Sequence, residues 1–139
     1  MRTQYAALPF RYGEGGIQIL LVTSRETKRW VIPKGWPMKG KHPHQAAARE
    51  AFEEAGIKGE VSRIPIGAYT YGKRLRDGTV VPCRVEVFPL HALEQRRRWP
   101  EFDQRETAWF TPRAAAGSVQ EPDLAALILG FALALTDAA

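Results

Sequence analysis

The stretch that decides the fold covers residues 35–57 and reads GWPMKGKHPHQAAAREAFEEAGI. Residues 45–55 are dense in strong helix formers, and Gly56 follows them as a typical C-cap. Residues 34–43 contain two glycines, two prolines and three lysines, a composition typical of a loop. The stretch therefore predicts a turn-rich loop followed by a helix.

Three glutamates of this helix, Glu50, Glu53 and Glu54, stand at positions i, i+3 and i+4. A helix places such side chains on one side within about one turn. Three like charges there destabilise the helix unless a cation offsets them, and Arg49 supplies only one. Clustered carboxylates are ligands of hard divalent ions such as Mg²⁺ or Mn²⁺. Taken by itself, a solvated acidic face is the commoner explanation of such a charge run.

The whole stretch resembles the signature of the Nudix hydrolases, which favours the metal-binding explanation. That signature is a Gly, five residues, Glu, seven residues, Arg-Glu, an aliphatic residue, any residue, Glu-Glu, any residue, Gly and an aliphatic residue. The matching positions in this sequence are Gly35, Arg49, Glu50, Glu53, Glu54, Gly56 and Ile57, with Ala51 as a small aliphatic residue. This number of matches over 23 residues makes a chance resemblance improbable.

One position departs from the signature, because Lys41 stands where the loop Glu is expected. In the family that Glu lies near the signature Arg, so Lys41 and Arg49 would repel each other unless Lys41 turns outward. Two possibilities stay open. Either activity is weakened, or the lysine contacts substrate phosphates.

The same loop also matches part of a P-loop. Residues 35–41 fit its first half, but His42 and Pro43 follow where a Ser or Thr would hold Mg²⁺, so we reject ATP-driven switching. The two histidines of the loop, His42 and His44, flank Pro43. Beside a hard-ion carboxylate site we expect them to be loop or capping groups rather than ligands, and we propose no zinc.

The rest of the chain predicts strands around this helix. Apolar or β-branched runs predict strands at residues 5–10, 17–23, 30–33, 59–71, 80–90 and 107–111, and helices are expected to begin at Pro112 and to cover residues 121–137. With no repeat or linker, we expect a single domain over residues 1–139. The fold class is α/β, and the resemblance implies the Nudix α/β/α sandwich with a mixed sheet.

The resemblance also implies roles for individual residues. Glu50 and Glu54 would be the principal ligands of Mg²⁺ or Mn²⁺, with Glu53 as a further ligand or metal-water contact and the backbone carbonyl of Lys34 completing the shell. Arg49 would hold Glu50 in position. A water molecule would attack phosphorus, and the general base is a Glu of the motif, such as Glu53, in some relatives and a Glu of a later loop in others. Among the later carboxylates we slightly prefer Glu101 to Glu106, although a solvated loop carboxylate is the commoner role of either.

Similarity over about residues 5–131 is to the branch that hydrolyses diphosphoinositol polyphosphates and diadenosine polyphosphates, and the GWPMKG loop resembles a bacterial subgroup. Basic segments around the motif suit a substrate with many phosphates. The expected substrate-binding residues are Arg29, Lys39, Lys41 and Lys73. Trp36 or Tyr71 would be able to stack on a base, although packing is the commoner use of aromatic residues.

The composition of the chain indicates the kind of partner and the cell compartment to expect. Twenty Lys and Arg against 15 Asp and Glu give a net charge of +5, which favours a polyanionic partner without naming it. A single cysteine and the lack of a signal-like or membrane-spanning segment lead us to expect a cytoplasmic protein, as a monomer or homodimer. No RNA-recognition motif is present, so we do not expect nucleic acid as a partner. The alternative function is a catalytically weak Nudix-fold module that senses a nucleotide or binds RNA.

Overall fold

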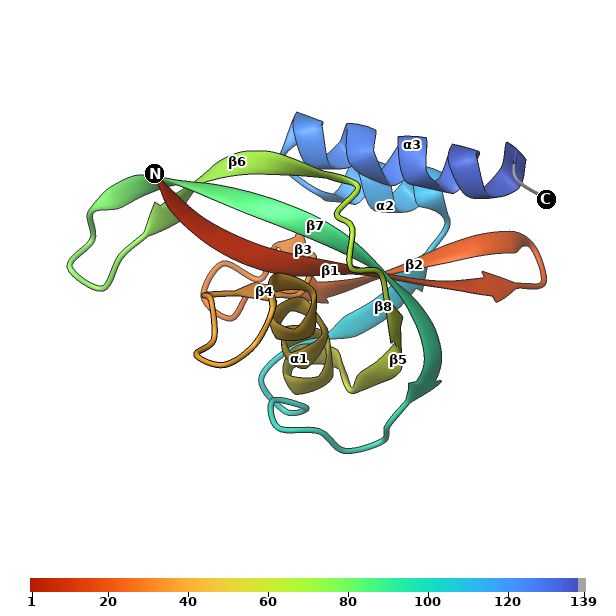
Figure 1. Ribbon diagram of the computed structural model, residues 1–139, viewed down its shortest axis with the longest axis horizontal. Coiled ribbons are helices and arrows are strands. Elements are labelled where there is room, and N and C mark those ends of the chain that lie inside the picture. Colours follow the sequence, from red (N-terminus) through yellow and green to blue (C-terminus); the bar gives the residue numbers. More distant parts are fainter. Residues whose placement is uncertain (138–139) are drawn as a thin grey trace.

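The structure, a computed structural model, describes residues 1–137. Within these residues, three helices and eight strands follow one another (Figure 1). The elements are β1 (Arg2–Gly13), β2 (Gly16–Thr23), β3 (Trp30–Val31), β4 (Lys34–Gly35), α1 (Pro43–Ala55), β5 (Ile57–Val61), β6 (Gly67–Arg74), β7 (Val80–Gln95), β8 (Thr107–Phe110), α2 (Pro112–Ser118) and α3 (Pro122–Asp137).

The sheet is mixed, as expected. Strand β1 runs parallel to β7 over a long register, from Arg2 opposite Cys83 to Phe10 opposite His91. All other pairs are antiparallel, and the main strand order is β3-β2-β1-β7-β5. The short strand β4 pairs with β1 through Gly35 and Lys34, so it attaches the beginning of the motif loop to the central strand.

Helices cover both faces of this sheet (Figure 1), which confirms the sandwich. On one face, three alanines of α1 (Ala47, Ala51 and Ala55) pack with side chains such as Leu20 and Phe88. On the other face, Leu124 and Ile128 of α3 pack with side chains such as Leu8 and Ile19. Period-two alternation along the strands separates the two cores. None of the helices described within residues 1–137 is long and apolar enough to span a membrane.

The C-terminus of α1 is fixed by Gly56, as the sequence predicts. Its φ of 72° is left-handed, and its N–H donates to the Ala51 and Phe52 carbonyls. A side chain here would also meet the Trp99 ring, whose nearest atom is 2.5 Å from a Cβ built at position 56. The helix begins at Pro43, slightly before the expected start at residue 45, with His42 as N-cap. The His42 N–H donates to Gln45 Oε1 at 2.8 Å, so the side chain of Gln45 supplies this hydrogen bond at the helix N-terminus.

The prediction of one continuous strand over residues 59–71 is wrong. The stretch divides into β5 and β6, separated by a segment that contains Pro65. The reason is the length of β7, which reaches Gln95 instead of ending at Leu90 and has room for two partners in succession. Strand β6 pairs with its first half and β5 with its second half.

Candidate functional site

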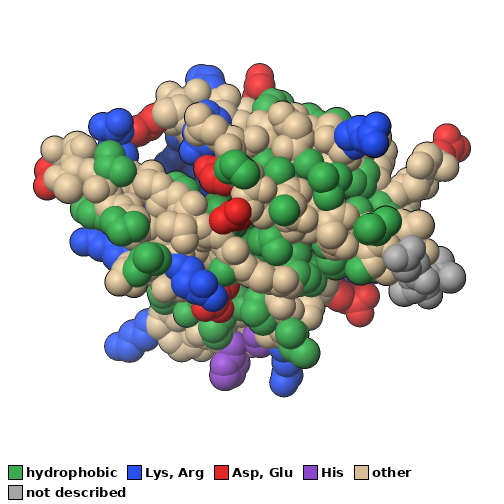
Figure 2. Space-filling view, turned by 90° about the horizontal axis from the view of Figure 1, so that it is seen from above, with side chains coloured by type: hydrophobic (Ala, Val, Ile, Leu, Met, Phe, Trp, Pro, Cys, Tyr) green, Lys and Arg blue, Asp and Glu red, His purple; other side chains and the backbone are tan. Residues whose placement is uncertain are grey.

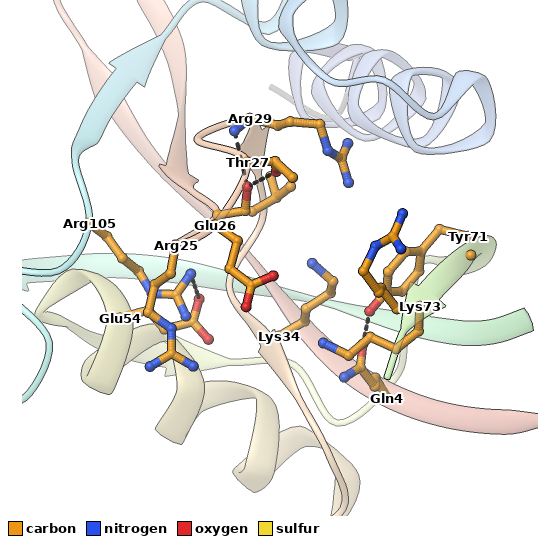
Figure 3. Close-up of a pocket in the computed structure, with 14 residues that line it drawn as sticks. Gln4, Arg25, Glu26, Thr27, Arg29, Lys34, Glu54, Tyr71, Lys73 and Arg105 are labelled. Atoms are coloured by element: carbon orange, nitrogen blue, oxygen red, sulfur yellow. Dashed lines mark hydrogen bonds and ion pairs between the residues drawn. The ribbon is translucent and has the colours of Figure 1, made fainter. Parts of the chain in front are cut away.

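A pocket of about 500 Å³ opens beside the N-terminal half of β1 (Figure 3). It is formed by β1, the β2–β3 loop with β3, β4, the C-terminal turn of α1, the end of β6 and the segment before β8. Its lining residues are Gln4, Ser24, Arg25, Glu26, Thr27, Arg29, Val31, Lys34, Glu54, Tyr71, Gly72, Lys73, Arg74 and Arg105. In Figure 2, Lys and Arg side chains gather around a hollow on the side of the β6–β7 hairpin.

The acidic end of the pocket is formed by Glu54, with Glu50 one turn earlier on α1. Glu54 is only 4% exposed, and a hydrogen bond joins the two carboxyl groups. Burial raises the pKa of Glu50 to about 7 and that of Glu54 to about 8, and each carboxyl is further disfavoured as an anion by its neighbouring glutamates. The helix thus presents two desolvated carboxyl groups, and the nearby cations do not compensate for the cost of ionising both of them.

Strand β4 approaches this pair so closely that position 35 has no room for a side chain. A Cβ built on Gly35 would collide with the carboxyl group of Glu50. The backbone of β4 at Gly35 therefore lies against the carboxyl group of Glu50. Oxygen donors of this kind suit Mg²⁺ or Mn²⁺.

Arg49 pairs with Glu53 and not, as expected, with Glu50. The Arg49 guanidinium lies 3.6 Å from Glu53, not against Glu50, and its charge centre is 5.2 Å from the Phe52 ring centroid. Since residues 49 and 53 are one turn apart, they pair on a flank of α1 outside the pocket lining. Within residues 1–137, no three Asp, Glu, His or Cys side chains are close enough to hold a metal by themselves. Any ion bound here needs backbone, water or substrate oxygens in addition.

The segment before β8 brings Glu101 to the acidic end of the pocket. Its backbone N–H donates to the Glu53 carbonyl at 3.0 Å, and its carboxylate accepts from Arg105 at 2.9 Å. Arg105 also lies 3.7 Å from Glu54. Glu106 is exposed and does not line the pocket; its N–H donates to the side chain of Thr23.

The remaining wall of the pocket is cationic. Lys34 projects into the pocket with its ammonium 5.0 Å from the centroid of the Tyr71 ring, and burial lowers its pKa to about 8 (Figure 3). The Tyr71 hydroxyl donates to Gln4 at 2.6 Å. Arg29 is held by an ion pair of 3.4 Å with Glu121, the residue before α3. The structure thus brings two of the expected substrate-binding residues, Arg29 and Lys73, into one pocket.

The other two expected substrate-binding residues, Lys39 and Lys41, do not line this pocket. Lys41 borders a separate hollow of about 230 Å³ together with Arg49 and Lys58, on the far flank of α1. Trp36 is 40% exposed and lies outside both hollows.

Sequence reasoning missed Arg105, which contacts two of the carboxylates. Its spacing of four residues from Glu101 was visible in the sequence, but the Arg-rich surroundings made it one of several candidates. Gln4 and Glu26 were also missed, since no motif marks them.

Comparison with known proteins agrees with this geometry. The family model described as NUDIX domain matches residues 1–128. The chain belongs to the Nudix hydrolase family. Similar proteins include "Nudix hydrolase 16, mitochondrial" of Arabidopsis thaliana, which is 31% identical over 138 residues covering 89% of this chain and 76% of the relative. "Diphosphoinositol polyphosphate phosphohydrolase 3-beta" of Bos taurus is 41% identical over 107 residues, covering 76% of this chain and 61% of the relative.

Among solved structures, this Nudix hydrolase is similar to "Crystal Structure of a C. elegans Ap4A Hydrolase Binary Complex". The TM-score is 0.72 at 20% identity, with 99% of both chains covered, which shows the shared fold. The chain spans 50% of "Nudix hydrolase 12, mitochondrial" of Arabidopsis thaliana, so some relatives are considerably longer.

Proposed function

We propose that this Nudix hydrolase is a metal-dependent pyrophosphohydrolase that cleaves a phosphoanhydride bond in a small polyphosphate. The observation that carries the proposal is the charge of the pocket beside the Glu50–Glu54 pair. Six lining side chains are cationic and two are carboxylates, which leaves an excess of four positive charges. The cationic residues are Arg25, Arg29, Lys34, Lys73, Arg74 and Arg105.

This distribution suits a substrate with several phosphates in a row. Lys and Arg make charge-assisted hydrogen bonds to phosphate oxygens. Lys73 lies on β6, across the pocket from Glu54 (Figure 3), so phosphates near the acidic end and phosphates further away both meet cations. We assign Arg29 and Lys73 to substrate binding on this basis. The positions of Lys39 and Lys41 supply no comparable support for the substrate role expected of them.

Members of the family generally use divalent cations. We propose Mg²⁺ or Mn²⁺, held by Glu50, Glu54 and the Lys34 carbonyl, with Glu53 reaching it through water. When bound, such an ion neutralises phosphate oxygens and lowers the pKa of a coordinated water. Two carboxylates suffice, because Mg²⁺ usually keeps several waters and takes its remaining ligands from substrate phosphates.

Glu101 is our proposed base. Water attacks phosphorus, the bridging P–O bond breaks with its electrons going to the leaving phosphate, and the proton lost by the water passes to the Glu101 carboxylate. Neither Glu101 nor Glu106 is among the lining residues of the pocket, but Glu101 is half-buried and linked to Glu54 through Arg105, whereas Glu106 is exposed. Arg49 would act indirectly, by holding Glu53 on the flank of α1.

The resemblance to diphosphoinositol polyphosphate phosphohydrolases and the fold of an Ap4A hydrolase make these two substrate classes our first choices. We propose a single catalytic domain. We also keep a cytoplasmic location as a proposal, because the one cysteine, Cys83, is unpaired and buried, although relatives named as mitochondrial or chloroplastic exist.

The test is a phosphate-release screen over diadenosine polyphosphates, diphosphoinositol polyphosphates, ADP-ribose and capped RNA, with Mg²⁺, Mn²⁺ or chelator. We expect turnover of the polyphosphates with either ion and none in chelator. Glu54→Gln should lower kcat about a hundredfold or more while the circular dichroism spectrum stays unchanged, because the substitution removes charge but keeps shape. Full turnover in chelator would exclude the metal-dependent mechanism. Tight nucleotide or RNA binding without turnover would instead favour the binding module.

A further inference from the structure

Arg105 connects three parts of the chain that are far apart in the sequence. Its Nε donates to Glu101 Oε1 at 2.9 Å, and its Nη1 donates to the Thr23 carbonyl of β2 at 3.2 Å. The same Nη1 lies 3.7 Å from Glu54 Oε1 on α1. The side chain is only 12% exposed, so these contacts are largely shielded from water.

The contacts hold the guanidinium in one orientation. A guanidinium is a rigid plane, so fixing Nη1 on a backbone carbonyl also fixes the direction in which Nε points. Nε then sets the position of the Glu101 carboxylate relative to Glu54. Glu101 is anchored at its other end too, because its backbone N–H donates to the Glu53 carbonyl at 3.0 Å. Backbone and side chain of Glu101 are therefore both tied to α1.

Arg105 differs in this respect from the other cations of the pocket. Its charge faces two carboxylates, those of Glu54 and Glu101, whereas none of the ion pairs within residues 1–137 involves Lys73 or Arg74. Because its Nε and Nη1 already make these contacts, the Arg105 guanidinium is less available to phosphates than the ammonium group of Lys73. The contacts of Arg105 are instead suited to keeping two mutually repelling carboxylates at a fixed separation.

We propose that Arg105 is a positioning residue of the active site, which holds the Glu101 carboxylate beside Glu54 so that the base meets the attacking water near the metal-binding carboxylates. The inference rests on the proposed function. Arg105 acts through Glu101 and does not itself exchange a proton.

The test is a double-mutant cycle with Arg105→Gln and Glu101→Gln, with Arg105→Lys as the conservative variant. Arg96→Gln is the matched control, because Arg96 is in the same segment but its side chain pairs only with Glu94, at the surface. Wild-type turnover of a polyphosphate with Mn²⁺ is measured first; its absence contradicts the proposed function itself. Mn²⁺ binding by electron paramagnetic resonance, in the absence of substrate, supplies a readout besides activity.

We expect Arg105→Gln to lower kcat at least tenfold with KM changed less than threefold, and to leave Mn²⁺ binding intact or tighter because a competing cation is removed. Arg105→Lys should recover part of kcat, and Arg96→Gln should match wild type. In the Glu101→Gln background, Arg105→Gln should add less than a twofold loss, since the residue through which it acts is already disabled.

A rise in KM with unchanged kcat would make Arg105 a substrate contact and overturn the proposal. Fully additive losses in the double variant would overturn it too, because Arg105 would then act independently of Glu101. If Arg105→Gln does not fold, Arg105→Lys with and without Glu101→Gln gives the same comparison, and equal losses in both backgrounds would count against positioning.

Discussion

Glu50 and Glu54 are one turn apart on α1 and are hydrogen-bonded to each other in a buried setting. Burial raises their pKa values to about 7 for Glu50 and about 8 for Glu54, so that near neutral pH Glu54 is mostly protonated and Glu50 about half protonated. A divalent cation reverses this preference, because it stabilises the anionic forms. Metal affinity should therefore increase with pH across this range.

The same shifts predict how stability depends on pH in chelator. Both carboxyl groups have folded-state pKa values above the ordinary value of 4.5, so the folded state binds protons that the unfolded state has released. The stabilisation is complete below about pH 4.5 and is lost as pH rises through 7 to 8. The opposite contribution of Lys34, whose folded-state pKa is about 8, matters only above that value.

We expect the Tm in chelator to fall by about 5 °C or more between pH 5 and pH 8, and Mg²⁺ to restore more of it at pH 8 than at pH 5. Glu54→Gln should flatten this dependence, whereas Glu60→Gln, at an exposed carboxylate, should not. A wild-type Tm that rises steadily from pH 5 to pH 8 in chelator would contradict the assignment. The measurement is differential scanning calorimetry.

At the scale of the element, α1 has three different flanks. Its alanines pack on the sheet, Glu50 and Glu54 face β4 and the pocket, and Arg49 and Phe52 border the second hollow with Lys41. The signature Glu would stand at position 41, close to Arg49. Its replacement by lysine places three cations, Lys41, Arg49 and Lys58, around one hollow.

Lys41→Glu is therefore expected to stabilise the protein. It replaces a repulsion by an exposed ion pair with Arg49. We expect the free energy of unfolding to increase by about 0.5 kcal/mol and the Tm by about 2 °C. Lys39→Glu is the control, because Lys39 belongs to the same loop but does not border the hollow. High salt should remove the gain. An unchanged or lower Tm in Lys41→Glu would show that Lys41 and Arg49 do not interact.

Kinetics of Lys41→Ala separate the two possibilities that the sequence leaves open. A KM that rises most for the substrate with the most phosphates would support contact with substrate. An unchanged KM for every polyphosphate would agree with the place of Lys41 on the far flank of α1.

At the scale of the whole molecule, the pocket exists because strands distant in sequence pair in one sheet. Strand β1 contributes Gln4, and β6 reaches the same place because it pairs with the first half of β7, which lies beside β1. The Tyr71–Gln4 hydrogen bond joins β6 and β1 directly. The cationic wall is thus a product of topology.

Lys73→Ala tests this wall. We expect KM to increase about three- to tenfold for a substrate with many phosphates and less for a shorter one, with kcat little changed, because one charge-assisted contact is lost. Arg76→Ala removes the same charge from the same hairpin at an exposed position outside the pocket and should leave KM unchanged. Equal increases in both variants would show general attraction of polyanions by the hairpin. Steady-state kinetics at two salt concentrations make the comparison.

The sequence by itself determined the features that depend on local geometry. Helix periodicity places Glu50 and Glu54 one turn apart, and Gly56 ends the helix because a residue without Cβ readily accepts a left-handed φ. The β1–β2 pair follows from two apolar runs around a glycine-rich turn. These features were predictable because each depends on residues a few positions apart.

Only the tertiary structure decided which of the many charged residues meet. Arg29, Lys73 and Arg105 are more than 30 residues apart along the chain, and their meeting depends on the register of β7 and the path of the segment before β8. Lys41 is near Glu50 in sequence, yet it borders a different hollow, because the loop approaches α1 from the flank of Arg49. Composition gives the number of charged residues, but long-range strand pairing sets the distances between them. Because the interaction of two charges weakens with distance, these distances decide which charged residues interact.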